Sequence, residues 1–252
     1  MKNIFDLKNK EILVTGGAGG IGFSLAYQLS ELGARITVTD LSYEKSKQAS
    51  EKLFGDGHKF YSLDISNEDD IKSFFDECAL KNNNFDVLIN CAGIAIFSQA
   101  LDMKSEDFKK TIDINLFGAF LISKYFAKSI IEKSSSGKII HLASVSSYVS
   151  NLNYSAYSSS KAGLYQLIRV LGREWAEKGI TVNAIGPAIT KTSLTEEIFK
   201  DSDWESRSLS QIPMRRFGTP EDLIGTIVLL ASDAGSFITG QTIFVDGGRT
   251  LT

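Results

Sequence analysis

The feature that most constrains the fold is the alternation of short apolar runs with longer stretches of helical periodicity along nearly the whole chain. Apolar runs of strand length separated by helices predict β-α-β units, which build a parallel sheet covered on both faces through right-handed crossovers. We therefore expect an α/β fold with a single doubly wound parallel sheet and helices on both faces. The apolar runs lie at residues 12–14, 36–38, 60–63, 87–89, 139–140, 180–185 and 242–245.

The length of 252 residues corresponds to one large domain or two small ones. No change of composition and no Pro-, Gly- or Ser-rich linker divides the chain, so we expect one domain over residues 1–252. Long helices are predicted over residues 105–132 and 155–178. A polar segment at 188–212 interrupts the strand–helix rhythm and predicts a late insertion.

Three helix ends carry recognisable signals. Gly33 is predicted to end the first helix in a left-handed conformation. Ser66 is predicted to cap another helix, with Asp69 three residues later as a variant of the capping box. Thr219 is predicted to cap a helix whose first turn contains Pro220.

The composition excludes several functional classes. The net charge of −3 and the lack of a basic block argue against a nucleic acid or an anionic membrane as partner. Cys78 and Cys91 are too few for a disulfide framework and favour a reducing compartment, so we expect a cytoplasmic protein. His58 and His141 lie far apart and no Cys/His cluster exists, so no metal site is expected. No signal-peptide run and no span of about 18 uncharged apolar residues is present.

A glycine-rich segment at residues 15–22, between the first predicted strand and helix, predicts a turn that binds a phosphate group. A helix N-terminus offers unpaired N–H groups and about half a positive charge, and glycine lets phosphate oxygens approach the backbone. Five glycines in eight residues satisfy three dinucleotide-binding spacings at once, so the segment alone does not select a family, and a merely flexible turn is the alternative. The expected cofactor contacts here are Gly16, Gly19, Gly20, Ile21 and Gly22.

Asp40 ends the second predicted strand, near the spacing from Gly16 at which a carboxylate meets the adenosine ribose of a dinucleotide. It would accept hydrogen bonds from both ribose hydroxyls. It would also repel a 2′-phosphate by about 4 kcal/mol for each pair of unit charges at ~4 Å and an effective dielectric constant of ~20. Neither Gly19 nor Leu41 offers a cation to that phosphate, so we expect NAD, with NADP less favoured. A carboxylate that only caps a turn is the alternative.

Further motifs follow the glycine segment in a fixed order, and together they resemble the compact branch of the short-chain dehydrogenase/reductase family. The resemblance covers almost the whole chain and implies a Rossmann-type sheet. Any one of these motifs is weak, whereas their order is specific. They are T-G-x-x-x-G-x-G from Thr15, N-C-A-G at 90–93, Asn115, Ser144, Y-x-x-x-K at 157–161 and V-D-G-G at 245–248.

The spacing of Tyr157 and Lys161 has a chemical consequence that does not depend on the resemblance. Residues i and i+4 share one face of a helix. A tyrosine with a pKa near 10 is a poor base at pH 7, and lowering that pKa by three units requires about 4 kcal/mol of stabilisation of the phenolate. One ammonium group at ~4 Å supplies energy of that order, so Lys161 is predicted to make Tyr157 a proton donor and acceptor.

The resemblance implies roles for the other residues. Lys161 would also hold the nicotinamide ribose, Ser144 would bind the substrate oxygen, and Asn115 would support a water relay. Ser146 and Tyr154 are expected in the substrate pocket with Ser144 and Tyr157. The remaining expected cofactor contacts are Asp64, Ile65, Asn90, Ala92, Gly93, Pro187, Thr190 and Thr192. Each residue taken alone has an ordinary structural explanation as a strand-end turn, a surface lysine or a helix-start aromatic.

The segment after Pro187 departs from the family pattern. Ala188 stands where the family usually has Gly, and Thr190 stands where it has Ile or Val. This segment borders the nicotinamide carboxamide in the family, so the departure bears on the pose of the cofactor. Residues 188–212 are expected to form a lid over the substrate.

The predicted function is reversible hydride transfer between a nicotinamide cofactor and a secondary alcohol or ketone, with a sugar, sugar acid or polyol as the substrate class. The opening residues 5–8 resemble gluconate-type dehydrogenases of the family, whose members are commonly homotetramers. Three alternatives stay open: a 3-oxoacyl-[acyl-carrier-protein] reductase, a sugar-nucleotide epimerase or dehydratase, and a non-catalytic NAD-sensing protein. A serine hydrolase is excluded because no G-x-S-x-G motif occurs.

Overall fold

The computed structural model of the protein describes residues 3–191 and 202–252. Its seven strands form one sheet in the order β3-β2-β1-β4-β5-β6-β7, and every pair of neighbours is parallel. The predicted α/β fold with a Rossmann-type sheet is confirmed. The strands are β1 (Glu11–Thr15), β2 (Arg35–Asp40), β3 (Lys59–Ser62), β4 (Val87–Asn90), β5 (Gly137–Leu142), β6 (Ile180–Pro187) and β7 (Thr242–Val245).

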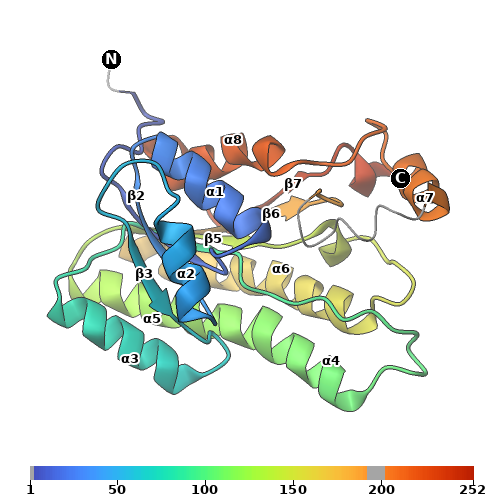
Figure 1. The fold of residues 1–252 in the computed structure, drawn as a ribbon, viewed down its shortest axis with the longest axis horizontal. Helices are drawn as coiled ribbons and strands as arrows, with labels where there is room; N and C mark the ends of the chain where they lie inside the picture. The colour runs from blue at the N-terminus through green and yellow to red at the C-terminus, as the bar shows by residue number, and fades with distance from the viewer. Residues whose placement is uncertain (1–2, 192–201) are drawn as a thin grey trace.

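Helices cover both faces of the sheet (Figure 1). One hydrophobic cluster joins the sheet to α1, α2 and α8, and the other joins it to α3, α5 and α6. The bounds are α1 (Gly20–Glu31), α2 (Tyr43–Ser50), α3 (Glu68–Leu80), α4 (Ser105–Ile112), α5 (Ala119–Glu132), α6 (Ser155–Trp175), α7 (Ser202–Ser210) and α8 (Pro220–Ala231).

The middle residues of the central strands β1 and β4 are apolar because both faces of these strands are buried. In β1, Leu13 packs into the cluster beneath α3, α5 and α6, whereas Ile12 and Val14 pack into the cluster beneath α1 and α8. All three side chains are fully buried. Strands in a parallel sheet with helices on both sides therefore appear as continuous apolar runs rather than as alternating ones.

Two of the three predicted helix ends are confirmed. Gly33 has a φ of +83° just after α1, and Thr219 caps α8 in a capping box with Asp222, with a proline in the first turn. The prediction of Ser66 as a cap was wrong. Asn67 caps α3 because its carboxamide oxygen accepts hydrogen bonds from the N–H groups of the first turn.

One helical segment of the described residues, Ser105–Glu132, is long and apolar enough to cross a membrane by length and composition, with a mean hydropathy of 1.3. It comprises α4, a π-helical turn at Asp113–Gly118 and α5. Half of its most apolar window is buried inside the protein, and Leu121, Ile122 and Phe126 belong to the core. The segment packs against the sheet as part of the core of the protein.

Candidate active site

The turn between β1 and α1 leaves no room for side chains at two of its glycines. A Cβ atom on Gly16, which has a φ of +62°, would lie 2.7 Å from the backbone nitrogen of Ala92. A Cβ atom on Gly22 would lie 2.2 Å from the carbonyl oxygen of Gly16. At Gly19, which caps α1 without a side-chain hydrogen bond, the same position is open. This uncapped helix N-terminus beside open space fits the pyrophosphate of a dinucleotide.

Asp40 lies at the carboxyl end of β2, beside this turn. The turn is tied to β2 by a hydrogen bond of 3.0 Å from the Gly17 N–H to the Thr39 carbonyl. The Asp40 carboxylate is partly exposed and makes no hydrogen bond to any residue the structure describes. Lys45 of α2 lines a cavity of about 100 Å³ with Ala18 of the turn, so a cation that sequence reasoning missed lies close to the phosphate-binding region.

Two of the expected cofactor contacts, Asp64 and Ile65, lie after β3. The Asp64 carboxylate accepts hydrogen bonds from the backbone N–H of Ser66 at 2.9 Å and from its hydroxyl at 2.6 Å, which fixes the loop before α3. Ile65 is buried, and a Cβ atom on Gly118 would lie 2.8 Å from its carbonyl oxygen. The π-helical turn therefore packs directly against this loop.

The Asn90 side chain is held within the sheet by its own hydrogen bonds. Its side chain accepts a hydrogen bond from Thr15 Oγ1 at 2.5 Å and lies 3.1 Å from Nδ1 of His141. His141 Nε2 lies 2.9 Å from Ser123 Oγ, and burial lowers the pKa of this histidine to about 3. A neutral buried network thus joins the carboxyl ends of β1, β4 and β5. These hydrogen bonds fix the Asn90 side chain, and the expected contact of Asn90 with a cofactor stays a prediction.

Asn115 lies in the π-helical turn, an arrangement that often marks functional sites. Its Oδ1 accepts a hydrogen bond from the backbone N–H of Ile94 at 2.8 Å, and its Nδ2 donates to the Ile94 carbonyl at 2.8 Å and to Ser160 Oγ at 3.1 Å. A Cβ atom on Gly93 would lie 3.1 Å from Asn115 Oδ1 and 3.8 Å from Lys161 Nζ. Asn115, Gly93 and Lys161 therefore meet at one point.

The structure brings Ser144, Tyr157 and Lys161 together at the carboxyl end of β5. Lys161 is buried, its Nζ donates to the Leu142 carbonyl at 2.7 Å, and it lies 5.7 Å from the centroid of the Tyr157 ring. Ser144 hydrogen-bonds the Tyr157 hydroxyl. Its Oγ also accepts a hydrogen bond from the N–H of Ser146 at 3.1 Å. All four residues predicted to be catalytic thus lie in one cluster.

Burial dominates the electrostatics of this cluster. Desolvation lowers the pKa of Lys161 to about 8. Desolvation also raises the pKa of Tyr157 above its usual value, although the hydrogen bond from Ser144 opposes this rise. The Lys161 ammonium group is turned to the Leu142 carbonyl, and the lowering of the Tyr157 pKa by Lys161 stays a prediction.

Two aromatic rings pack against Tyr157. Tyr154 stacks on Phe97 with 4.2 Å between ring centroids, and both rings lie edge-on to Tyr157 at 6.0 and 5.9 Å. Ser146 Oγ accepts a hydrogen bond from Asn151 Nδ2 at 3.4 Å. Ser146 and Tyr154, the expected substrate contacts, thus lie beside the catalytic cluster.

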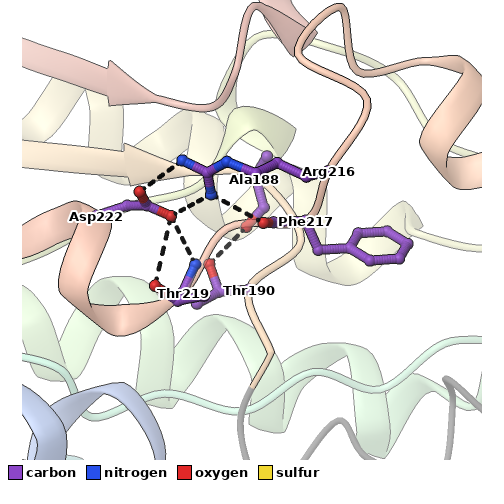
Figure 2. A network of polar contacts seen from close by, with 6 residues as sticks. All are labelled: Ala188, Thr190, Arg216, Phe217, Thr219 and Asp222. Carbon is purple, nitrogen blue, oxygen red and sulfur yellow. Dashed lines mark hydrogen bonds and ion pairs between the residues drawn. The ribbon is translucent and has the colours of Figure 1, made fainter.

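The segment after β6, which ends at Pro187, is fixed by a polar network (Figure 2). Thr190 Oγ1 donates to the Ala188 carbonyl at 3.0 Å, and Thr190 forms a β-bridge with the residue before Thr219. Arg216 binds the Asp222 carboxylate with two hydrogen bonds of 2.6 and 2.7 Å and keeps the pKa of that carboxyl well below its usual range. The expected cofactor contact Thr192 lies outside the described residues.

Comparison with known proteins decides the family. A family model described as "Enoyl-(Acyl carrier protein) reductase" matches residues 16–250. The 2-dehydro-3-deoxy-D-gluconate 5-dehydrogenase of Pseudoalteromonas atlantica is 36% identical over 247 residues, covering 97% of each chain. The chain belongs to the short-chain dehydrogenase/reductase family.

Other relatives in the family carry different names. The 3-oxoacyl-[acyl-carrier-protein] reductase FabG of Buchnera aphidicola is 36% identical over 246 residues, covering 98% of this chain and 99% of the relative. The crystal structure of a proposed 2-deoxy-D-gluconate 3-dehydrogenase from Agrobacterium tumefaciens, with bound NADP, has a TM-score of 0.90 and 31% identity and covers all of both chains.

Membership in the short-chain dehydrogenase/reductase family makes this protein an oxidoreductase that acts on CH–OH groups, and an NAD(P) cofactor is typical of the family. Sequence reasoning missed two groups near the site: Lys45 beside the glycine turn, and Arg249, which contacts Asn151 across 98 positions of the chain. Neither carries a local signal, because both approach the site only through the packing of distant segments.

Proposed function

We propose that the protein is an NAD-preferring dehydrogenase that interconverts a secondary alcohol and a ketone of a sugar acid. The observation that carries the proposal is the single cluster formed by Asn115, Ser144, Tyr157 and Lys161 at the carboxyl ends of the strands. The names of several relatives, among them 2-dehydro-3-deoxy-D-gluconate 5-dehydrogenases 33–36% identical to this chain, support the substrate class.

Tyr157 is the group that moves the proton in this proposal. It takes the proton of the substrate hydroxyl in oxidation and returns it in reduction, while Ser144 holds the same oxygen. A nicotinamide cofactor supplies the hydride acceptor or donor and, when oxidised, a cationic ring. Lys161 and Asn115 keep the pocket beside Tyr157 in shape. Phe97 and Tyr154 exclude water from one side of the Tyr157 ring.

The preference for NAD rests on Asp40. Its carboxylate lies free at the end of β2, where it accepts hydrogen bonds from ribose hydroxyls and repels a 2′-phosphate. The glycine turn binds the pyrophosphate through the N-terminus of α1. The NADP bound to a relative of 31% identity makes the ratio of kcat/KM for NAD and NADP the decisive measurement.

The experiment that tests the catalytic assignment is Tyr157→Phe. We expect kcat to fall by about 10²- to 10⁴-fold, the usual contribution of a general acid–base group, with NADH binding changed less than about twofold. Tyr165→Phe, a partly exposed tyrosine two turns later on α6, is the matched control and should retain activity. A Tyr157→Phe enzyme that keeps a tenth or more of its turnover contradicts the assignment.

A second candidate is a 3-oxoacyl-[acyl-carrier-protein] reductase, which the Buchnera relative favours at the same identity of 36%. An assay with acetoacetyl-CoA beside D-gluconate and 2-dehydro-3-deoxy-D-gluconate separates the two candidates. Higher kcat/KM for the thioester with NADPH contradicts the sugar-acid proposal. A protein that binds NADH but turns over none of these compounds would fit the non-catalytic NAD sensor.

The proposal includes a cytoplasmic homotetramer with residues 188–212 closing over the substrate. Phe117 and Ile131 leave partly exposed apolar surface on residues 115–132, one of the two long helices on which members of the family commonly build their tetramers. On the substrate side, Trp204 of α7 stacks on Phe217 with 6.1 Å between ring centroids, which holds α7 against the body of the protein.

A further inference from the structure

The C-terminal segment 246–252 packs against the end of the proposed lid. The backbone N–H of Met214 donates to the Gly247 carbonyl at 3.1 Å, and Thr252 Oγ1 donates to the Gln211 carbonyl at 3.1 Å. A Cβ atom on Gly247 would lie 2.9 Å from a side-chain carbon of Ile212. The tail therefore has a fixed position beside residues 211–214.

This position brings Arg249 to the loop that carries the catalytic serine. Arg249 Nη2 donates a hydrogen bond to Asn151 Oδ1 at 3.3 Å. Asn151 Nδ2 donates to Ser146 Oγ at 3.4 Å, and the Ser146 N–H donates to Ser144 Oγ at 3.1 Å. A chain of three hydrogen-bonded contacts thus leads from the guanidinium group to the serine beside Tyr157.

Arg249 is of intermediate exposure and forms no ion pair with the residues the structure describes. The acid nearest in sequence, Asp246, is already engaged, because its carboxylate accepts hydrogen bonds from the N–H of Gly248 and from the N–H and hydroxyl of Thr250. A guanidinium has five N–H donors, so most of those of Arg249 remain available for a ligand. A cation at a partly buried residue, with no counter-charge among the described residues, is stabilised when an anion binds beside it.

We propose that Arg249 binds the carboxylate of the substrate, with Asn151 orienting the guanidinium group. This inference rests on the proposed sugar-acid dehydrogenase activity and deepens it. A sugar acid carries its carboxylate several carbons away from the carbon that is oxidised. The charge that recognises the carboxylate must therefore lie to one side of Ser144 and Tyr157, as Arg249 does. The planar guanidinium also matches a carboxylate with two parallel hydrogen bonds.

The test compares D-gluconate with D-gluconamide, its neutral counterpart of nearly the same shape. In Arg249→Met, KM for gluconate should rise about 10- to 100-fold, the loss of one charge-assisted contact, with kcat changed less than about threefold. The kinetics with gluconamide should stay near those of the wild type. For Arg249→Lys, which keeps the charge but not the paired donors, KM for gluconate should lie between the values for the wild type and for Arg249→Met. Arg173→Met, an exposed arginine on α6, is the matched control.

A second variant separates ligand binding from bracing of the loop. If Arg249 only holds the loop at Ser146, then Arg249→Met and Asn151→Ala should impair gluconate and gluconamide equally, and that result overturns the inference. Dissociation constants measured in the Tyr157→Phe background replace KM for any compound that is not turned over. If the affinity for gluconate is unchanged in Arg249→Met, the role of Arg249 is refuted and the proposed function is not. A wild type that binds NADH but neither binds nor oxidises any sugar acid refutes the proposed function and this inference together.

Discussion

The cofactor side and the substrate side of the site meet at the carboxyl ends of the strands, but they are held by different interactions. On the cofactor side, backbone atoms approach so closely at Gly16 and Gly22 that no side chain fits. On the proposed substrate side, the contacts join side chains of distant segments, such as Arg249 with Asn151 and Trp204 with Phe217. The difference predicts that substrate preference can change while the cofactor turn is kept. Side-chain contacts can be exchanged without refolding the turn.

The strongest test of this comparison is to add one methyl group on the cofactor side. Gly22→Ala places a Cβ atom 2.2 Å from the Gly16 carbonyl oxygen, a distance that only movement of the turn can relieve. We expect the free energy of unfolding to fall by about 3 kcal/mol or more and NADH binding to be lost. Chemical denaturation and NADH fluorescence titration measure the two effects.

The control for this variant is Gly225→Ala. Gly225 also lies in a helix, α8, but a Cβ atom there would meet no heavy atom within 4 Å. Because alanine favours a helix over glycine by about 1 kcal/mol, this variant should be slightly more stable than the wild type. If Gly22→Ala behaved like Gly225→Ala, then the cofactor side would not depend on backbone contact.

The next largest effect is expected from the charge at the end of β2. Replacing Asp40 with Ser and Leu41 with Arg removes the repulsion of a 2′-phosphate and adds a cation. We expect the ratio of kcat/KM for NADP over NAD to rise by ~100-fold, corresponding to about 3 kcal/mol. Lys45→Met tests one of the two lysines, Lys45 and Lys52, that line a cavity with Ala18 of the glycine turn. A wild type that already prefers NADP, and loses that preference in Lys45→Met, contradicts the role given to Asp40.

The sequence predicted most of the fold and the positions of the catalytic cluster, because both depend on local patterns. Buried strands need apolar runs, and a tyrosine and lysine four residues apart share a helix face in any helix that contains them. The roles of the individual site residues stay predictions until variants are measured. The NAD preference likewise awaits kinetic measurement.

The errors and omissions fall where distant segments decide the outcome. Ser66 was predicted to cap α3, but it is bound to Asp64, and Asn67 takes the cap. The sequence also did not predict the partners of the Asn90 side chain, because His141 and Thr15 come from neighbouring strands that meet it only in the sheet. Contacts between neighbouring strands leave no trace in the local sequence.

Lys161 is expected to serve both the cofactor side and the substrate side of the site. Its burial predicts that the residue lowers the stability of the fold while activity requires it. A pKa of about 8 in the folded protein against 10.5 for the free side chain corresponds to a cost of about 3 kcal/mol at pH 7. Lys161→Met removes this cost but loses the charge-assisted hydrogen bond to the Leu142 carbonyl, worth about 2 kcal/mol. We therefore expect the ligand-free variant to be more stable by about 1 kcal/mol at pH 7 and to be inactive.

The pH dependence of that gain has a definite sign. Below about pH 8 both the folded and the unfolded wild type hold the proton on Lys161, so the full cost is present. Between pH 8 and 10.5 the unfolded chain holds more protons, and the stability of the wild type rises with pH. Urea denaturation at pH 7 and pH 10 should show the advantage of Lys161→Met shrinking, while exposed Lys72→Met shows no such trend. A variant less stable than the wild type at pH 7 contradicts this account.

The smallest effect is expected on the substrate side, at the stacking of Trp204 on Phe217. Phe217 is buried and also lies 5.5 Å from Lys191 Nζ, so it remains fixed when Trp204 is removed. Trp204→Ala should release α7 and raise KM for the substrate by ~5-fold, about 1 kcal/mol, because an aromatic pair contributes about that much. The melting temperature and the affinity for NADH should hardly change. Phe237→Ala, a fully exposed aromatic, is the control. A loss of NADH binding in Trp204→Ala would show that the two sides of the site are coupled after all.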